Sequence, residues 1–156
     1  MIKVLFVCHG NICRSPMAEF LFKDMVSKKG LSAKFEIASC ATSYEEIGNP
    51  VHFGTKKILN SLGIDCSKKK AIRMTVDDYN YYDYILLMDY NNLRNIKRIV
   101  EYDKDNKISL LLDYSDRDDK NIKDPWYTGN FTETYNDIIL GLDAFFNYLN
   151  EQNILY

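Results

Sequence analysis

The sequence predicts a single α/β domain in which a four-stranded parallel sheet carries helices on both faces. Two observations predict it. Four short apolar runs typical of buried strands occur along the chain, and amphipathic or helix-compatible segments alternate with them. Such alternation is typical of parallel sheets, because the crossover helices cover the two faces. The chain has 156 residues, enough for one domain with a substantial core. We therefore assign residues 1–156 to one domain.

The first strand and the helix after it are marked by a change in hydrophobic pattern. Ile2–Val7 is a short apolar run of the kind that forms a buried strand. Ser15 and Pro16 then predict a helix start, because a capping hydroxyl is followed by proline at the first helical position. Gly30 ends this helix. Its core-facing side has apolar residues at helical spacing, namely Ala18, Leu21, Phe22 and Met25.

The rest of the chain continues the alternation. We predict strands at Phe35–Ser39, Tyr84–Met88 and Ile108–Leu112, and helices over residues 54–62 (ended by Gly63) and Asn91–Val100. The last helix is the clearest, with one apolar stripe formed by Tyr135, Ile138, Ile139, Leu142, Phe145 and Leu149. The lysine tract 68–70 and the acidic tract 116–119 are interpreted as solvated loops.

Composition excludes several classes of protein. Hydrophobic residues make up 46% of the chain and charged residues 27%, as in ordinary soluble domains. No apolar run approaches the roughly 20 residues that span a bilayer, and the N-terminus does not resemble a signal peptide. We therefore expect a cytoplasmic protein without membrane insertion. The net charge of −2 gives no bulk attraction to nucleic acid, so no nucleic-acid partner is expected.

The charge is unevenly distributed. Residues 1–75 carry a net charge of +6 and residues 76–156 a net charge of −8. A basic N-terminal half would favour an anionic ligand there. The alternative, that these charges only solvate two faces of the molecule, stays equally open.

The segment Cys8–Ser15, "CHGNICRS", directly follows the first predicted strand. Ligands of parallel α/β sheets bind beyond the carboxyl ends of the strands, so the position suits a functional loop. A zinc site is one interpretation, since Cys8 and Cys13 form a C-x4-C pair beside His9. The other cysteines, Cys40 and Cys66, are widely separated and supply no second ligand pair, so we expect no metal. In a cytosolic chain these cysteines also argue against a structural disulfide framework.

A phosphate-binding loop is the better interpretation. A strand–loop–helix unit directs successive backbone N–H groups at one point, at the positive end of the helix dipole. Gly10 and Asn11 tolerate the unusual dihedrals of a tight loop, and the planar fork of Arg14 binds two phosphate oxygens at once. A thiol beside an arginine at a helix N-terminus is typically held as thiolate, so Cys8 is a candidate nucleophile. Cys8 taken alone would be better explained as an inert buried cysteine, but Arg14 follows it by six residues on the same loop and favours the nucleophile.

The pattern Cys8-x5-Arg14-Ser15, with "GNICRSP" complete, resembles the signature of the low-molecular-weight protein tyrosine phosphatase family. Three further segments occur in the family's order: "ATS…IGNP" (41–50), "DYILLMDYNNL" (83–93) and "DPWYTGNFTETY" (124–135). The resemblance thus covers nearly the whole chain. It implies a phosphatase that hydrolyses phosphotyrosine and small aryl phosphates through a phosphocysteine on Cys8, without a cofactor. Its partners would be phosphotyrosine-containing proteins, with inorganic phosphate and other oxyanions as competitive ligands.

The resemblance also implies roles for individual residues. Arg14 clamps the phosphate, and Asp124 is the general acid that protonates the leaving phenolate and then the base that activates water. An Asp-Pro turn without chemistry is the alternative for the Asp124 motif taken alone. The expected phosphate-binding loop is His9, Gly10, Asn11, Ile12, Cys13, Arg14 and Ser15, supported by Asn11, Ser15 and Ser39.

The expected pocket rim consists of Tyr44, Glu45, Trp126 and Tyr127. The family often has Trp at the position of Glu45 and usually Tyr at that of Trp126. The histidine that the family often has in the region Lys68–Arg73 is absent. Cys13 is expected to form a reversible disulfide with oxidised Cys8, the alternative being that it only packs behind the loop.

Three other functions share features with this sequence. Arsenate reductases share the fold and loop but need further cysteines, and this chain has none beyond Cys66. Protein arginine phosphatases typically have Thr where this loop has Ile12, so Ile12 favours phosphotyrosine, although the arginine branch stays open. A non-catalytic phosphotyrosine-binding module would need neither the nucleophile Cys8 nor the acid Asp124.

Overall fold

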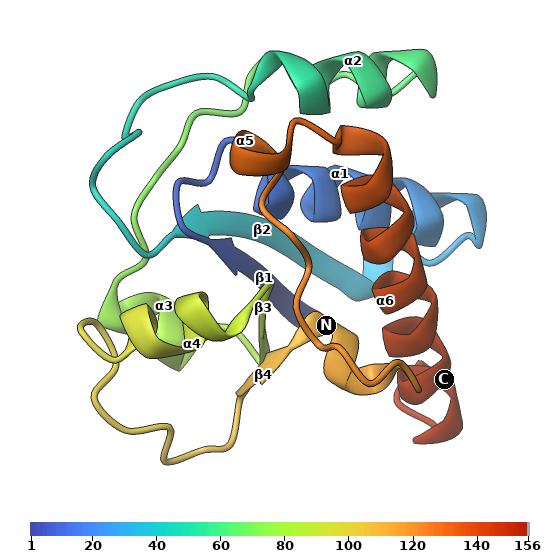
Figure 1. Cartoon of the computed structure of the whole chain (residues 1–156). Coiled ribbons are helices and arrows are strands. Elements are labelled where there is room, and N and C mark those ends of the chain that lie inside the picture. Colours follow the sequence, from blue (N-terminus) through green and yellow to red (C-terminus); the bar gives the residue numbers. More distant parts are fainter. Residues whose placement is uncertain (156) are drawn as a thin grey trace.

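The sheet confirms the predicted fold class. The structure, a computed structural model, describes residues 1–155; Tyr156, the last residue of the predicted domain, lies outside the described residues. Four parallel strands stand in the order β2-β1-β3-β4 (Figure 1). They are β1 (Ile2–Cys8), β2 (Phe35–Ala41), β3 (Tyr84–Leu87) and β4 (Ile108–Leu110). Central β1 pairs along its whole length with β2, from Ile2 opposite Phe35 to Cys8 opposite Ala41.

Helices cover both faces of the sheet (Figure 1). They are α1 (Arg14–Lys28), α2 (Phe53–Ser61), α3 (Val76–Tyr81), α4 (Tyr90–Ile96), α5 (Pro125–Thr128) and α6 (Phe131–Glu151), with 3-10 turns η1 (Ser32–Lys34) and η2 (Leu111–Tyr114). Side chains alternate along β1, so Val4 and Phe6 pack against α1 and α6, whereas Leu5 and Val7 pack in a second cluster with α3 and α4. Among the described residues, no helix is both long and apolar enough to cross a membrane.

The predicted start of α1 is wrong. The helix begins at Arg14, and Cys13 occupies the cap position without a side-chain hydrogen bond. Ser15 lies inside the first turn, and its hydroxyl oxygen is 3.0 Å from the Cys8 sulfur rather than on a backbone cap. The chain curls into the helix early because the N–H groups of Asn11 and Ser15 converge on that sulfur.

Two predicted elements are shorter than expected. The helix predicted over Asn91–Val100 ends at Ile96, whose carbonyl accepts from both Ile99 and Val100 in a closing turn. The strand predicted over Ile108–Leu112 ends at Leu110, where the Asp113 carboxylate accepts from the Leu110 N–H and starts η2. Val100 beyond the first end, and Leu111 and Leu112 beyond the second, are still buried, so the apolar pattern continues past the regular element.

Two short helices, α3 and α5, were not predicted. The capping box of Thr75 and Asp78 marks the first, and Asp124 followed by Pro125 marks the second. The α5 segment lies beside the loop between β1 and α1 (Figure 1). The carboxyl-terminal edge of the sheet therefore collects three loops, those after β1, β2 and β3, together with α5.

Candidate active site

The loop after β1 curls around the Cys8 sulfur. The N–H groups of Asn11 and Ser15 donate to this sulfur at 3.3 and 3.4 Å. Cys8 itself is buried at the end of β1. Asn11 has a φ of +60°, the left-handed region that asparagine tolerates better than most residues. The loop thus points two backbone donors at the Cys8 sulfur.

The side chain of Asn11 holds the loop in this conformation. Its amide nitrogen donates to the hydroxyls of Ser15 at 2.8 Å and Ser39 at 2.9 Å, and its carbonyl oxygen accepts from the Ile72 N–H at 3.1 Å. Because Asn11 donates to the Ser15 oxygen, the Ser15 proton can be donated to the Cys8 sulfur at 3.0 Å or to the Cys40 carbonyl at 3.5 Å. The structure thus brings together the three residues predicted to support the loop.

The support continues into a buried ion pair that the sequence analysis missed. Ser39 donates to the Glu19 carboxylate at 2.6 Å, and Glu19 is only 4% exposed. The ammonium of Lys69 lies 3.6 Å from that carboxylate and donates to the Ser39 carbonyl at 2.8 Å. The interpretation of 68–70 as a solvated loop is therefore wrong for Lys69. In the region without the family's usual histidine, Lys69 supplies a largely buried cation.

Replacing Lys69 with methionine is expected to destabilise the fold. The change leaves the Ser39 carbonyl without its lysine donor and removes one of the two cations beside Glu19. A buried group that loses its partner costs about 1–3 kcal/mol. Urea unfolding measures this loss, with exposed Lys68→Met as the matched control. Equal free energies of unfolding for the two variants would show that Lys69 does not stabilise the side chains that support the loop after β1.

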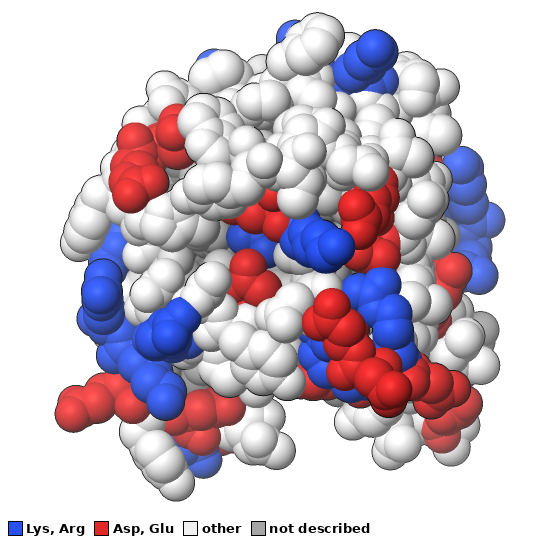
Figure 2. Space-filling view, viewed as in Figure 1, with Lys and Arg blue, Asp and Glu red and all other residues white. Residues whose placement is uncertain are grey.

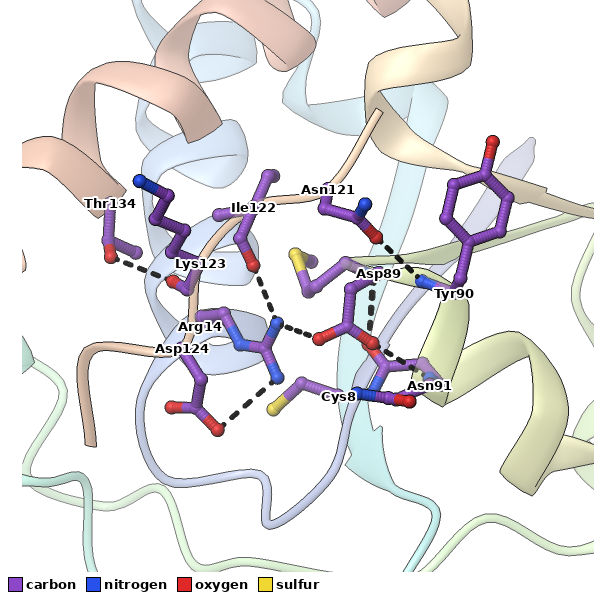
Figure 3. Close-up of polar contacts among 12 residues, drawn as sticks. Cys8, Arg14, Asp89, Tyr90, Asn91, Asn121, Ile122, Lys123, Asp124 and Thr134 are labelled. Atoms are coloured by element: carbon purple, nitrogen blue, oxygen red, sulfur yellow. Dashed lines mark hydrogen bonds and ion pairs between the residues drawn. The ribbon is translucent and has the colours of Figure 1, made fainter. Parts of the chain in front are cut away.

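Arg14 lies almost completely buried beneath the loop, between two carboxylates (Figure 3). One guanidinium nitrogen donates to Asp89 at 2.6 Å and to the Ile122 carbonyl at 2.8 Å, and the other donates to Asp124 at 3.4 Å. Burial by itself lowers the pKa of Arg14, but the negative groups of Cys8, Asp89 and Asp124 outweigh burial and raise it. Arg14 is therefore a fixed cation beside the Cys8 sulfur.

Asp89 is a site residue that the sequence analysis did not name. It lies two residues after the end of β3 and caps α4, accepting from the Asn92 N–H at 2.8 Å with one oxygen while the other accepts from Arg14. Asp89 could have been found from the sequence, because it is an aspartate just beyond the carboxyl end of a predicted buried strand, where parallel α/β sheets bind their ligands.

Asp124 reaches the same place from a distant part of the chain. One of its oxygens accepts from the Trp126 N–H at 3.0 Å and caps α5, and the other faces Arg14. Its side chain is 22% exposed. Pro125 begins the helix and fixes the backbone beside it. Asp124 therefore lies on the guanidinium edge that opens toward the Cys8 sulfur (Figure 3).

A pocket of about 100 Å³ opens above the loop. Its lining residues are Cys8, His9, Gly10, Ile12, Cys13, Arg14, Glu45, Glu46, Asp124, Trp126 and Tyr127. Trp126 and Tyr127 are exposed at its mouth, and the Trp126 and His52 rings form a T-shaped pair with centroids 5.6 Å apart. Tyr44 is not among the lining residues: its ring lies on the Arg73 guanidinium, 4.1 Å from centroid to carbon.

The pocket walls combine one buried cation with acidic groups at the rim. Apart from Arg14 and His9, the charged residues that line it are Glu45, Glu46 and Asp124. The basic excess of residues 1–75 is thus not gathered around the pocket, and an anion would be bound by Arg14 and backbone N–H groups. Within the described part of the chain, no three His, Cys, Asp or Glu side chains converge as metal ligands would.

Cys13 lies at the same pocket as Cys8, and both are free thiols in the structure. Burial, followed by the negative groups of Cys8 and Asp124, raises the pKa of the Cys13 thiol far above its ordinary value. Cys13 therefore stays protonated at neutral pH.

Comparisons with known proteins agree over nearly the whole chain. The family model described as low molecular weight phosphotyrosine protein phosphatase matches residues 3–154. Low molecular weight protein-tyrosine-phosphatase YfkJ of Bacillus subtilis is 44% identical over 134 residues, covering 85% of this chain and 86% of YfkJ. The YfkJ crystal structure matches with a TM-score of 0.93 at 40% identity, covering 97% of this chain and 96% of that one. The crystal structure of DARP, a drosophila arginine phosphatase, matches with a TM-score of 0.84 at 28% identity, covering 94% of this chain and 97% of the DARP chain.

Proposed function

We propose, from the premise that this chain belongs to the low molecular weight phosphotyrosine protein phosphatase family, that it hydrolyses phosphotyrosine in proteins through a phosphocysteine on Cys8. The observation that carries the proposal is the meeting of Cys8, Arg14 and Asp124 at one pocket. A nucleophile, a phosphate clamp and an acid are the groups that this reaction requires. We assign the activity to one catalytic domain, residues 1–156, and a cytoplasmic location stays a prediction.

In the first step, the Cys8 thiolate attacks the phosphorus atom of the substrate. The S–P bond forms and the P–O bond to the phenyl ring breaks, while Asp124 transfers its proton to the leaving phenolate oxygen. Arg14 and the N–H groups of the loop bind the non-bridging oxygens. The phosphate would take the guanidinium edge now facing Asp124, which leaves this carboxyl group to face the leaving oxygen.

In the second step, water attacks the phosphorus of the phosphocysteine. Asp124, now a carboxylate, takes a proton from the water, and Cys8 leaves as thiolate while inorganic phosphate is released. The Ser15 hydroxyl and the N–H groups of Asn11 and Ser15 stabilise the departing sulfur. Free phosphate and other oxyanions are therefore expected to compete with substrate for the same loop.

The pocket mouth favours an aryl phosphate. Trp126 and Tyr127 stand exposed beside the loop and offer flat apolar surfaces to a phenyl ring. A phosphoserine side chain is shorter, so its phosphate would not reach Cys8 at the pocket floor. The DARP similarity keeps phosphoarginine as a second candidate substrate, whereas apolar Ile12 in the pocket wall favours the phenyl group.

A comparison of phosphopeptides tests the proposed substrate. Peptides that carry phosphotyrosine, phosphoserine or phosphoarginine in one common sequence are incubated with the protein, and Cys8→Ser protein is the blank. We expect release of phosphate from the phosphotyrosine peptide at the highest kcat/KM. Preferential release from phosphoarginine would move the chain to the arginine branch. Saturable binding of the phosphotyrosine peptide without turnover would make it a binding module.

We further propose that Cys13 protects Cys8 from irreversible oxidation. Hydrogen peroxide converts the Cys8 thiolate to a sulfenic acid, and the Cys13 thiol then displaces water to form a disulfide. The protonated state of Cys13 supports this order, because the thiolate oxidises first.

A Cys13→Ser variant is therefore expected to lose recovery after peroxide. Parent protein inactivated by peroxide should regain most of its activity in dithiothreitol, and Cys13→Ser should regain a clearly smaller share because Cys8 proceeds to sulfinic acid. Recovered activity is measured with p-nitrophenyl phosphate, and Cys66→Ser, at a distant buried thiol, is the control. Equal recovery in parent and Cys13→Ser would reduce Cys13 to a packing role.

A further inference from the structure

Two residues at the pocket mouth, His9 and Glu45, contact each other and have no part in the proposed chemistry. The His9 Nε2 atom lies 2.8 Å from a Glu45 carboxylate oxygen. His9 comes from the loop after β1 and Glu45 from the loop after β2, so the contact joins two segments that are 36 positions apart in sequence. Both line the pocket. Acidic side chains gather over the loop after β2 in Figure 2.

Glu45 is the rim carboxylate best placed to meet a ligand. His9 contacts one of its oxygens, and 68% of its side chain is exposed. The other acidic rim groups have partners: the Glu46 carboxylate accepts from Asn49 at 2.6 Å, and Asp124 faces Arg14. Arg73, a half-buried cation beside the same loop, lies over the Tyr44 ring and donates to the Thr42 carbonyl at 3.2 Å. Glu45 therefore offers a positioned negative charge beside a pocket whose floor is cationic.

From this arrangement, and resting on the proposed function, we propose that Glu45 selects phosphotyrosine sites that have a basic residue next to the phosphotyrosine. The phosphate would bind the cationic floor, while a neighbouring Lys or Arg side chain would reach the carboxylate at the rim. An acidic neighbour would be repelled. His9 is a positioning residue, because it holds the Glu45 carboxylate at the pocket wall through the Nε2 contact.

Three phosphotyrosine peptides test the proposal. They are identical except for Lys, Gln or Glu at both positions that flank the phosphotyrosine. At low ionic strength we expect kcat/KM to fall in the order Lys, Gln, Glu, with about a three- to tenfold ratio between the Lys and Glu peptides. Added salt should shrink this ratio, since the rim charge is exposed and screened.

Substitutions then assign the preference to Glu45. In Glu45→Gln, the ratio of kcat/KM for the Lys peptide to kcat/KM for the Glu peptide should fall at least about twofold, as expected for the loss of an exposed ion pair. Exposed Glu101→Gln, the matched control, should keep the parent ratio. At pH 8, His9→Gln should keep the preference because its amide can hold the carboxylate, whereas His9→Ala should weaken it.

The outcomes separate this inference from the function on which it rests. The role of Glu45 is overturned if the parent protein hydrolyses the three peptides at equal kcat/KM, or if Glu45→Gln keeps the parent's ratio between the Lys and Glu peptides. Either result leaves the phosphatase function in place. Hydrolysis of none of the phosphotyrosine peptides overturns the proposed function and this inference together.

Discussion

Cys8→Ser protein is expected to bind phosphate and to have lost turnover. The proposed reaction passes through an S–P bond, and a serine hydroxyl stays un-ionised where the thiolate is the attacking group. We expect kcat for p-nitrophenyl phosphate to fall by about 10⁴-fold or more, as for the loss of other enzyme nucleophiles. The Arg14 clamp and the loop donors are left in place, so the anion site should persist.

Phosphate binding by this variant can be followed directly. Trp126 is the one tryptophan in the chain and stands at the pocket mouth, so its fluorescence reports on an occupied pocket. Serine lacks the negative charge of the thiolate, so inorganic phosphate should bind at least as tightly as to the parent. Cys66→Ser, at a buried thiol away from the pocket, should keep its turnover. Turnover by Cys8→Ser within tenfold of the parent would contradict the phosphocysteine mechanism.

Asp124→Asn protein is expected to fail on substrates with poor leaving groups. Asparagine caps a helix as well as aspartate does, so α5 should keep its start and the fold should survive. It has no proton to transfer, and the loss of a general acid typically slows a reaction by about 10²–10⁴-fold. Phenyl phosphate and phosphotyrosine should show the full loss.

The leaving group distinguishes lost acid catalysis from a disturbed pocket. p-Nitrophenolate leaves without much help from an acid, so kcat/KM for p-nitrophenyl phosphate, which reports on the first step, should fall far less than kcat/KM for phenyl phosphate. The kcat values also include the second step, in which Asp124 acts as base for every substrate, so kcat/KM is the quantity compared. A damaged pocket would slow both substrates equally. Asp118→Asn, in an exposed acidic loop, is the matched control and should behave as the parent. An unchanged rate of phenyl phosphate hydrolysis in Asp124→Asn would remove Asp124 from the mechanism.

The sheet was predictable because burial imposes a pattern on each strand separately. Ile2–Val7 is apolar nearly throughout, as expected for a central strand covered on both faces. The observed strand β1 is one residue longer than predicted, because it includes Cys8. Element ends were less predictable. Ser15 is a residue type that commonly caps helices, but its hydroxyl contacts the Cys8 sulfur and the helix starts two residues earlier than predicted, at Arg14 instead of Pro16.

That Cys8 and Arg14 meet at one pocket was also predictable, because both belong to one strand–loop–helix unit. The support behind that loop was not. Nothing local distinguishes Lys69 from its neighbours in a lysine tract, and its burial follows from Glu19 on α1 and from the end of β2. Asp89 likewise takes its role from the distance to Arg14 that the packing of β3 beside β1 sets.

By itself the sequence determined the fold class and singled out Cys8 and Arg14 as the proposed nucleophile and phosphate clamp, because alternation of buried residues and a six-residue spacing within one loop are local properties of the chain. Only the tertiary structure decided which distant side chains complete the site. It brings Asp124 to Arg14 across 110 positions and Glu45 to His9 across 36. Contacts of this kind depend on how the loops at the carboxyl edge of the sheet pack together, and no periodicity along the chain encodes that packing.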